Sequence, residues 1–406
     1  MTPRHRIRFS AGFFFFSLLW MTALGIVASV LLPQRLAEIA PDSKEAVFGV
    51  LNAATAVVSL ISNLIVGNLS DRTRSVFGRR APWILSGGVL AGITLFLIGV
   101  LPNAFLIGVS YCLAMVGLNM MIAPVMASLA DRVSESMRGT MSAFISAGTL
   151  VGQSVGTLIG AVFITSVLPG FVISGVVMAI SGLAAVILWP REKSAQDLPV
   201  LEKDFASILR SFRPPRNAPD FYRAFAGRSL VILSYYMILN YQLYILQDYI
   251  GLSTENSAAT IGTMSILLMI VSFVAALTAG PISDRLGRRK LPVVGASILL
   301  AIGYALPWIF PSVLSMILFA AIGGGLGYGM YGSVDQALNV DVLPKDENAG
   351  RNLGFLNIGT TLGQMAGPIL TSVIVSVTQS YQLVFPTAIV LVVVGCLFIL
   401  HIKSVR

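Results

Sequence analysis

The sequence predicts an all-α membrane protein in which twelve transmembrane helices form two pseudo-symmetric six-helix bundles. Three observations carry this prediction: apolar runs recur along the whole chain, charged residues are scarce, and one basic motif occurs twice. Each run has about 20 residues, which is the length that a helix needs to cross the hydrocarbon core of a bilayer. Of the 406 residues, 56% are hydrophobic and 11% are charged, whereas soluble proteins carry about 25% charged residues.

The apolar runs give the order of the chain: six predicted spans, a polar segment and six further spans. The spans are expected at residues 10–32, 46–69, 82–101, 104–129, 139–167, 170–189, 225–251, 258–282, 291–310, 312–338, 351–378 and 383–402. No small-residue cleavage site follows the first run, so we expect a retained span and not a signal peptide. The expected domains are a first bundle at 1–189, a cytoplasmic linker at 190–224 and a second bundle at 225–406. Within the linker, Leu201 to Phe212 is a candidate amphipathic helix on the membrane surface.

The basic motif occurs each time between two apolar runs. Its first copy is Gly67 to Trp83, GNLSDRTRSVFGRRAPW, and its second copy is Gly280 to Arg289, GPISDRLGRR. The Ser-Asp-Arg of the two copies is 213 residues apart, and the first copy has four extra residues, Thr73 to Val76, before the shared Gly-Arg-Arg. Two such turns half a chain apart indicate a duplicated unit.

Spans 5 and 11 extend the repeat, because glycines recur at every fourth position in both. These glycines are Gly148, Gly152, Gly156 and Gly160 in span 5 and Gly359, Gly363 and Gly367 in span 11. Small residues at this spacing make a smooth face that another helix can approach closely, so we expect the glycines to serve packing. A glutamine follows the second glycine of each span, Gln153 and Gln364.

The basic residues predict the orientation. If the loops alternate between two sides, all but Arg35 and Lys44 of the 27 Lys and Arg lie on one side. Basic loops stay in the cytoplasm, so we expect both termini to be cytoplasmic and the protein to lie in the inner cell membrane. The net charge of +9 is then a topology signal, and no nucleic-acid partner is expected.

The two cysteines, Cys112 and Cys396, lie in different runs and do not suggest a disulfide framework.

Polar residues inside the predicted spans indicate a cavity. We place two acidic residues there, Asp248 and Asp335, and no Lys or Arg. Such residues are costly in hydrocarbon and normally face a protein interior or a water-filled space. In span 7, Tyr236, Asn240, Tyr244 and Gln247 are predicted to share one helical face. An aromatic belt at the membrane interface is the alternative explanation, but it does not suit a mid-span asparagine.

The predicted substrate site lies near the bilayer midplane between the two repeats, as in transporters of this construction. Its amides and aromatic rings suit a neutral polyhydroxylated ligand such as a sugar, and also a drug or lipid of mixed polarity. The expected substrate-binding residues are Trp20, Asn119, Gln153, Asn240, Tyr241, Tyr244, Tyr328 and Gln364. Asp248 is the first candidate for coupling to an ion. Asp335 is the second, because it could instead belong to a cytoplasmic gate.

The two basic turns are the candidate cytoplasmic gate. A carboxylate at a helix end can pair with an arginine of a neighbouring helix through charge-assisted hydrogen bonds. The free energy of a few such bonds is similar to the free-energy difference between two conformations of a protein. The alternative is that these charges only cap helices and fix the orientation. The candidate gate residues are Asp71, Arg72, Arg79, Arg80, Asp131, Asp284, Arg285, Arg288 and Asp341.

Enzymatic chemistry has little support in this sequence. The G-x-G-x-x-G match at Gly327 to Gly332 lies inside an apolar run with no strand before it, so the dinucleotide interpretation fails. The histidines, His5 and His401, lie near the ends of the chain, and no metal-ligand spacing or Ser-His or Cys-His partnership is present. No Walker A motif occurs, so direct use of ATP is not expected. We therefore expect no catalytic residue, no cofactor and no metal.

The two basic motifs resemble the loop signature of the major facilitator superfamily, and the resemblance covers essentially the full chain. Within it, RSVFGRRAPW at Arg74–Trp83, YQLYILQD at Tyr241–Asp248 and AGRNLGFLN at Ala349–Asn357 are similar to the sucrose and glycoside–pentoside–hexuronide cation symporter branch. The resemblance implies alternating access and uptake of a sugar or glycoside with a proton or a sodium ion. Spans 1 to 6 lack the charged residues that members of the branch often place there.

Two other functions stay open at this point. One is an exporter of a drug-like or lipidic amphiphile, and the other is a membrane sensor that does not transport. The sensor is disfavoured because no soluble output domain is present. The expected partners are a small-molecule substrate, a coupling cation and the lipid bilayer. A monomer is expected, because one chain supplies both halves of a pathway.

Overall fold

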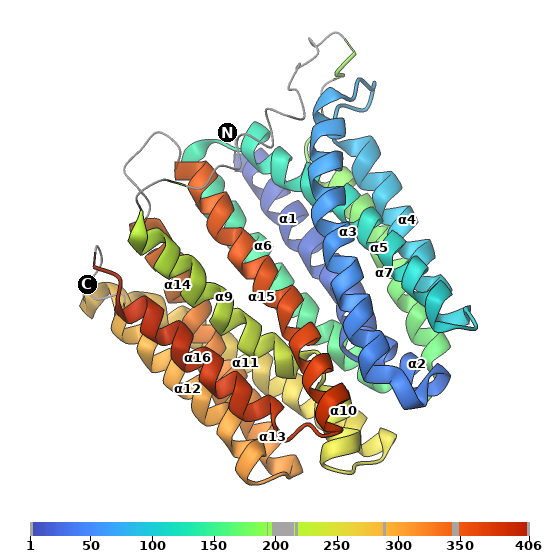
Figure 1. Ribbon diagram of the computed structural model, residues 1–406. Helices are drawn as coiled ribbons and strands as arrows, with labels where there is room; N and C mark the ends of the chain where they lie inside the picture. The colour runs from blue at the N-terminus through green and yellow to red at the C-terminus, as the bar shows by residue number, and fades with distance from the viewer. Residues whose placement is uncertain are drawn as a thin grey trace. The chain divides into compact units, whose positions relative to one another are not determined.

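The computed structural model describes residues 3–192, 194–196, 215, 218–286, 290–342 and 349–403. The chain divides into two compact units (Figure 1). The first unit comprises Met1–Val47 and Ala54–Phe205, and the second comprises Phe48–Ala53 and Ala206–Arg406. The amphipathic helix expected at residues 201–212 lies outside the described residues.

Long helices with short connections make up the first unit. They are α1 (Pro3–Ile26), η1 (Val27–Leu31), α2 (Leu32–Ile39), η2 (Pro41–Ser43), α3 (Lys44–Arg72), α4 (Ala81–Val100), α5 (Ala104–Arg132), α6 (Glu135–Val162) and α7 (Val167–Leu188). The part of α3 at Phe48–Ala53 belongs to the second unit. Asn103 begins α5 as a side-chain cap, because its Oδ1 accepts the N–H of Leu106 at 2.9 Å.

The second unit has the same kind of helices with more interruptions. They are α9 (Pro219–Leu239), α10 (Gln242–Tyr244), η3 (Ile245–Tyr249), α11 (Thr254–Leu286), α12 (Lys290–Ile309), α13 (Val313–Leu318), η4 (Phe319–Tyr328), α14 (Gly329–Asp341), α15 (Ala349–Thr378) and α16 (Val384–Leu400). Helix α13 starts with a reciprocal capping box between Ser312 and Ser315.

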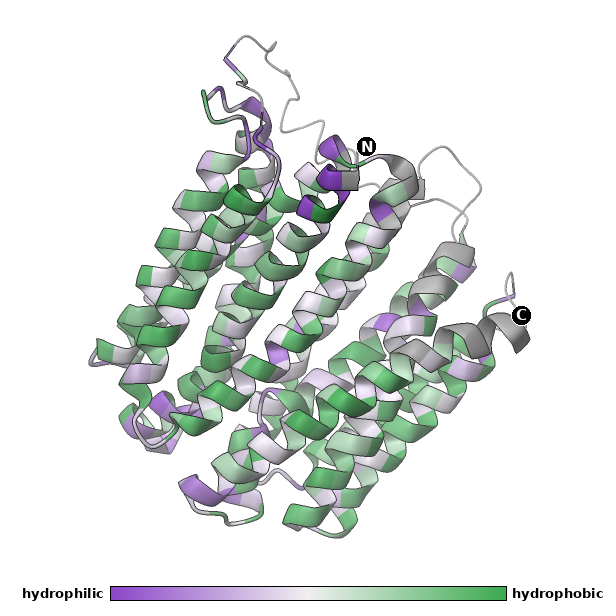
Figure 2. Ribbon diagram, turned by 180° about the vertical axis from the view of Figure 1, so that it is seen from behind, coloured by the Kyte–Doolittle hydropathy of each residue, from purple (hydrophilic) through white to green (hydrophobic). Residues whose placement is uncertain are grey.

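The number of spans agrees with the sequence prediction. Among the described residues, ten helices are long and apolar enough to cross a membrane. The bent pair formed by α9 and the segment Gln242–Tyr249 makes an eleventh span if it is counted as one, and α16 is a shorter apolar helix. Figure 2 shows hydrophobic residues along the helices and hydrophilic residues gathered near their ends. The chain is therefore an all-helical membrane protein.

Span 7 differs from its prediction in two ways. Its helix begins at Pro219 instead of residue 225, so Arg228, which falls just inside the predicted limits, lies well within the helix. The helix is also bent by 47° at the break before Gln242, where the N–H of Tyr241 bonds the carbonyl of Ile238, three residues back. The single continuous face predicted through Tyr236, Asn240 and Tyr244 is therefore wrong, because the break turns the chain between them.

Both units use the same packing scheme. In the first, α1 packs on α6 and α7, and α4 packs on α5 and α7. In the second, α9 packs on α15 and α16, and α12 packs on η4 and α16. These are the same pairs of spans in the same order, which is the structural form of the duplication.

The spaced glycines permit the closest of these contacts. A Cβ at Gly152 would lie 2.4 Å from the carbonyl oxygen of Leu18, and a Cβ at Gly363 would lie 2.7 Å from that of Ser229. Real Cβ atoms do not approach backbone so closely, so only glycine lets α6 meet α1 and α15 meet α9 in this way. The packing role expected for these glycines is confirmed.

Candidate functional site

Arg80 is the centre of a buried charge cluster in the first unit. It precedes α4 and is 5% exposed. Its Nη2 lies 2.6 Å from Asp71 Oδ1 and 2.8 Å from Asp131 Oδ2, and its Nη1 donates to Ser70 Oγ at 2.6 Å. Burial opposes the charge of the guanidinium, but the hydrogen bonds and charges of Asp131 and Asp71 outweigh it and raise the pKa of Arg80. The cluster joins the end of α3 and the end of α5 to the start of α4.

The four extra residues of the first motif copy, Thr73 to Val76, tie the loop to the segment that follows α7. The carbonyl of Ser75 accepts the N–H of Gly78 at 3.1 Å and the N–H of Ala195 at 3.0 Å. Gly78 has φ of 93°, and a Cβ there would lie 2.3 Å from the carboxylate of Glu192. Only glycine suits this position, and the close approach holds Glu192 against the loop.

The other gate candidates are only partly described. Arg72 is exposed and Arg79 is half-buried. The side chains of Asp284, Arg285 and Asp341 and the whole of Arg288 lie outside the described part of the chain. The pairing of acids with an arginine is thus observed for the first copy, within one unit, and the gate itself stays a prediction.

A second buried arginine, Arg228, joins three helices of the second unit. Its Nη1 lies 3.0 Å from Asp335 Oδ2 in α14, and its Nε donates to Thr360 Oγ1 in α15 at 2.7 Å. Tyr331 donates its hydroxyl to Asp335 Oδ1 at 3.0 Å. Arg228 and Asp335 are 5% and 3% exposed, so both charges are removed from solvent and depend on each other.

The sequence prediction that no Lys or Arg lies within a span is wrong for Arg228. Arg228 was counted with the preceding loop, although it falls within the predicted span 225–251, because a basic residue near the start of an apolar run is typical of a loop. A signal was present, since an acid inside an apolar run needs a counter-charge. Asp335 had no other partner proposed for it.

A row of tyrosines leads away from this ion pair. The ring of Tyr331 stacks on Tyr328 with centroids 6.4 Å apart, and Tyr328 stacks on Tyr235 of α9 at 3.9 Å and 10°. Nearby in α9, the Tyr236 hydroxyl accepts a hydrogen bond from Gln364 Nε2 at 3.1 Å. Two predicted substrate-binding residues, Tyr328 and Gln364, therefore contact successive tyrosines of α9, Tyr235 and Tyr236 respectively.

The remaining candidates of the second unit lie around the break after α9. Asn240 is the half-buried residue that follows the helix. Tyr241 and Tyr244 are fully buried and pack edge-on against Phe48 of the same unit, with centroids 5.2 Å and 6.0 Å away. Asp248, the first coupling candidate, is exposed in η3, in contrast to the buried Asp335.

In the first unit, Asn119 has the best-defined polar contacts of the three predicted substrate-binding residues. It is 7% exposed, donates to the carbonyl of Met115 at 2.8 Å, and accepts from Asn63 Nδ2 at 3.0 Å. Trp20 in α1 and Gln153 in α6 are both half-buried. Within the described residues, no group of three or more His, Cys, Asp or Glu could hold a metal ion.

The repeated helix pairs, the glycine contacts and the buried ion pairs define a multi-pass membrane protein built from two similar units. A sequence profile described as Major Facilitator Superfamily matches residues 9–258 and 229–405. The chain belongs to the major facilitator superfamily. It is accordingly a secondary transporter of a small-molecule substrate and not an enzyme.

Solved structures agree with this fold. The human organic anion transporter MFSD10 (TETRAN) is similar at a TM-score of 0.70 and 16% identity, over 98% of this chain and 100% of that chain. A bacterial homolog of the human lysosomal transporter Spinster, inward-facing and occupied, is similar at 0.71 and 15% identity, over 100% and 98% of the two chains. At such identities the likeness concerns the fold alone. No curated protein matches the sequence.

Proposed function

We propose that this transporter imports a sugar or glycoside together with a proton or a sodium ion, by alternating access, and that Asp335 carries the coupling. One observation carries the proposal: the stacked tyrosines join a predicted substrate residue, Tyr328, to the buried pair of Asp335 and Arg228. Binding or release of a cation at Asp335 changes its attraction to Arg228. Such a change can pass to Tyr328 through the hydrogen bond and the ring of Tyr331.

The chemistry around the tyrosines supports a neutral ligand. Arg228 is already balanced by Asp335, so the region offers phenol and amide groups without surplus charge. Aromatic faces and amides bind the apolar faces and hydroxyl groups of sugars. The motifs that are similar to the sucrose and glycoside–pentoside–hexuronide branch support the same substrate class.

The proposed setting is the inner cell membrane with both termini in the cytoplasm. All but two of the 27 Lys and Arg support this orientation. The Arg80 cluster then lies at the cytoplasmic end and is proposed to act as one half of a gate. The second half would be formed by the other motif copy, with Asp284, Arg285, Arg288 and Asp341.

Vesicle transport tests the coupling residue. The purified protein is reconstituted, and uptake of a panel of radiolabelled sugars is measured with and without an imposed proton or sodium gradient. We expect Asp335→Asn to abolish gradient-driven accumulation while exchange of preloaded sugar continues. Asp248→Asn is the matched control, with the same change of carboxylate to amide at an exposed position, and it should keep both activities.

Two outcomes contradict the proposal. Accumulation by Asp335→Asn at the wild-type level would show that this carboxylate does not carry the coupling. Loss of accumulation in Asp248→Asn with Asp335→Asn unaffected would return the role to Asp248. If Asp335→Asn is too unstable to purify, the double variant Arg228→Gln with Asp335→Asn removes both charges and is measured instead.

Export of a drug-like or lipidic amphiphile is the second candidate function. The flat Tyr235–Tyr328 stack favours it, because such a surface also binds apolar rings. Among the structures of similar fold, MFSD10 is named an organic anion transporter, and the other is a bacterial homolog of the human lysosomal transporter Spinster. Gradient-driven movement of a fluorescent lipophilic dye out of loaded vesicles, with no uptake of any sugar in the panel, would favour this function.

A further inference from the structure

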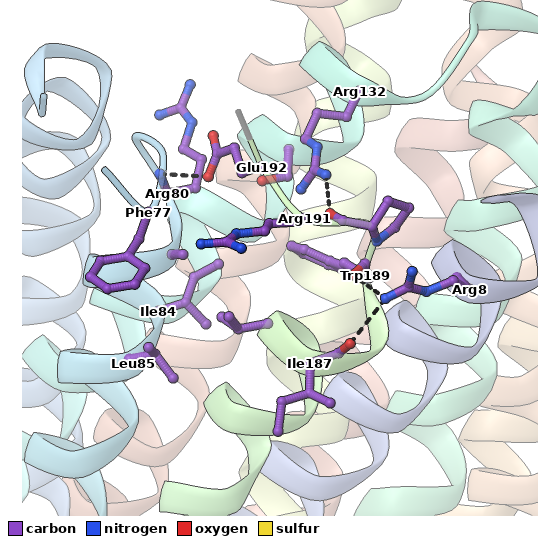
Figure 3. A pocket seen from close by; sticks show the side chains of 14 residues that line it. Arg8, Phe77, Arg80, Ile84, Leu85, Arg132, Ile187, Trp189, Arg191 and Glu192 are labelled. Carbon is purple, nitrogen blue, oxygen red and sulfur yellow. Dashed lines mark hydrogen bonds between the residues drawn. The ribbon is translucent and has the colours of Figure 1, made fainter. Parts of the chain in front are cut away.

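A pocket of about 370 Å³ lies in the first unit, where α4 begins and α7 ends (Figure 3). Its wall combines guanidinium groups on one side with aliphatic side chains on the other. The basic residues on the wall are Arg8, Arg80, Arg132 and Arg191, and the one acid is Glu192. The predicted substrate and coupling residues do not line this pocket, so it is a separate feature of the molecule.

Three of the four arginines already make hydrogen bonds, and Arg132 does so by donating Nη2 to the carbonyl of Pro190. Arg8 donates to the carbonyls of Leu188 and Trp189 at 2.9 Å and 2.8 Å, which closes the end of α7. Arg80 is balanced by the carboxylates of Asp71 and Asp131. A backbone carbonyl does not neutralise a guanidinium, so the surplus positive charge on the wall comes from Arg8, Arg132 and Arg191, against the one carboxylate of Glu192.

Arg132 and Arg191 face only one acid on the pocket wall. The interaction with Glu192 partly offsets the effect of burial, which lowers the pKa of Arg132. Arg191 is exposed, and Figure 3 shows its guanidinium reaching into the pocket. Two cations with one shared carboxylate leave room for an anionic partner.

Three buried polar groups of the lining residues have no hydrogen-bond partner in the described structure, and Trp189 Nε1 is one of them. Ser128 Oγ is fully buried and makes no hydrogen bond, and Arg80 Nε is likewise buried without an acceptor. A buried donor that lacks a partner costs free energy, and such groups in a native protein need an explanation. An oxygen-rich anion inside the pocket would accept hydrogen bonds from Ser128 Oγ and Arg80 Nε.

The opposite wall is apolar and continues along two helices. On α7, Ile187 lines the pocket and is 62% exposed, and Leu183, Ile180 and Val176 follow it on the same face, with exposures of 46%, 45% and 53%. On α4, Leu85 lines the pocket, and the exposed Val89, Ile93 and Val100 continue its face. Helices α4 and α7 pack together, so two apolar stripes leave the pocket side by side along spans of the membrane.

We propose that this pocket binds the headgroup of an acidic phospholipid. The phosphate accepts hydrogen bonds from Ser128 and Arg80 and balances Arg132 and Arg191, and the acyl chains lie along the stripes of α4 and α7. A free phosphate would use the polar wall but leave the apolar wall and its two stripes unused. The pocket also lies at the polar end of membrane spans, which is the depth at which lipid headgroups lie.

The test uses the full chain, purified in detergent and stripped of lipid. Thermal unfolding is followed as monomeric dihexanoyl phosphatidylglycerol, dihexanoyl phosphatidylcholine or inorganic phosphate is added. A ligand that binds the folded state raises the Tm, and the rise grows with the logarithm of the ratio of ligand concentration to Kd. We expect phosphatidylglycerol to raise the Tm at concentrations at which the other two have little effect.

Arg191→Gln is the test variant and Arg74→Gln the matched control, because Arg74 is an exposed arginine of the same basic region that does not line the pocket. Arg191→Gln should weaken phosphatidylglycerol binding about fivefold, which corresponds to about 1 kcal/mol for one basic residue near a lipid surface. Arg74→Gln should bind as the wild type does. Ser128→Ala should also weaken binding.

Three results would overturn the proposal. Equal Tm shifts with the two lipids would mean nonspecific solvation of apolar surface. An equal shift with inorganic phosphate would mean an anion site without a lipid. Equal weakening by Arg191→Gln and Arg74→Gln would mean a diffuse surface charge effect and no built pocket.

Discussion

The two units share their packing and differ in where they bury an arginine. In the first, Arg80 lies at a helix end, and its two carboxylates are 34% and 57% exposed. In the second, Arg228 lies inside α9, and both it and Asp335 are nearly inaccessible, with side-chain exposures of 6% and 4%. An exposed pair is weakened by solvent, whereas a buried pair leaves a bare charge when one partner is lost.

The glycine contacts let the two units be aligned residue by residue. Gly152 meets Leu18 and Gly363 meets Ser229, so both partners are displaced by 211 positions. The same displacement places Ser17 opposite Arg228 and Thr149 opposite Thr360. Ser17 is buried and uncharged, so the first unit has the threonine at this place but not the arginine. Packing was kept in both copies while the ion pair occurs in one, which is why we associate the pair with function and not with the fold.

The largest expected effect is the loss of one partner of the buried pair. Arg228→Met should destabilise the protein by about 3–5 kcal/mol, because Asp335 is left as an uncompensated buried charge. The double variant Arg228→Met with Asp335→Leu should recover much of this loss and still fail to accumulate substrate. Thermal or denaturant unfolding in detergent measures the first effect and vesicle uptake the second. If Arg228→Met alone is as stable as the wild type, the contrast between the two arginines is wrong, because the Arg228–Asp335 pair would then be solvated like the Arg80 cluster.

The next largest effect is expected at the glycines that permit close helix packing in both units. A Cβ at Gly156 would lie 2.3 Å from the carbonyl oxygen of Thr22, and one at Gly367 would lie 2.8 Å from that of Leu233. Both Gly156→Ala and Gly367→Ala should destabilise by about 1–3 kcal/mol, as overpacking does, with the larger loss at Gly156. Gly295→Ala is the control, because nothing lies within 4 Å of a Cβ there, and it should be neutral or stabilising. Equal behaviour of all three would contradict the shared close packing.

The features that could be predicted from the sequence are those encoded locally. The spans follow from the length of the apolar runs, and the close approach of another helix to α6 and α15 follows from glycines at every fourth position, although the pattern does not say which helix approaches. The pairing of Asp71 with an arginine was also predicted, but a loop of several residues decides that Arg80 is the partner. Neither the position of Arg80 between two helices nor its contact with Asp131 has a periodic signal in the sequence.

The features that were missed depend on distant parts of the chain. Arg228 is buried because α14 and α15 bring Asp335 and Thr360 to it, and the sequence around Arg228 alone resembles a basic loop. The break at Tyr241 depends on a tightened turn that replaces one regular helical hydrogen bond, and tyrosine and asparagine do not signal such a turn in the way that proline does. Tertiary contacts decide both features.

The smallest effect on stability is expected in the Arg80 cluster, whose carboxylates are partly exposed. Asp131→Asn should cost no more than about 1 kcal/mol, because the Asp131 side chain is 57% exposed and Arg80 keeps Asp71 and Ser70. Asp42→Asn, an exposed acid in η2, is the matched control and should have no effect. Unfolding in detergent gives the difference, and a loss as large as that of Arg228→Met would mean that the two arginines are equivalent.

Asp71→Asn separates a gate from a helix cap, because a gate predicts a change in conformation and a cap predicts a loss of stability. With Cys112 and Cys396 replaced by serine, a reporter is introduced as Gly67→Cys, where a side chain meets nothing within 4 Å. If the Arg80 cluster holds one end of the transporter closed, Asp71→Asn should raise the rate at which a membrane-impermeant thiol reagent labels the reporter, while unfolding changes little. An unchanged labelling rate together with a lower Tm would mean that the cluster only caps helices. Arg80 would then stabilise the first unit without controlling access to the transport pathway.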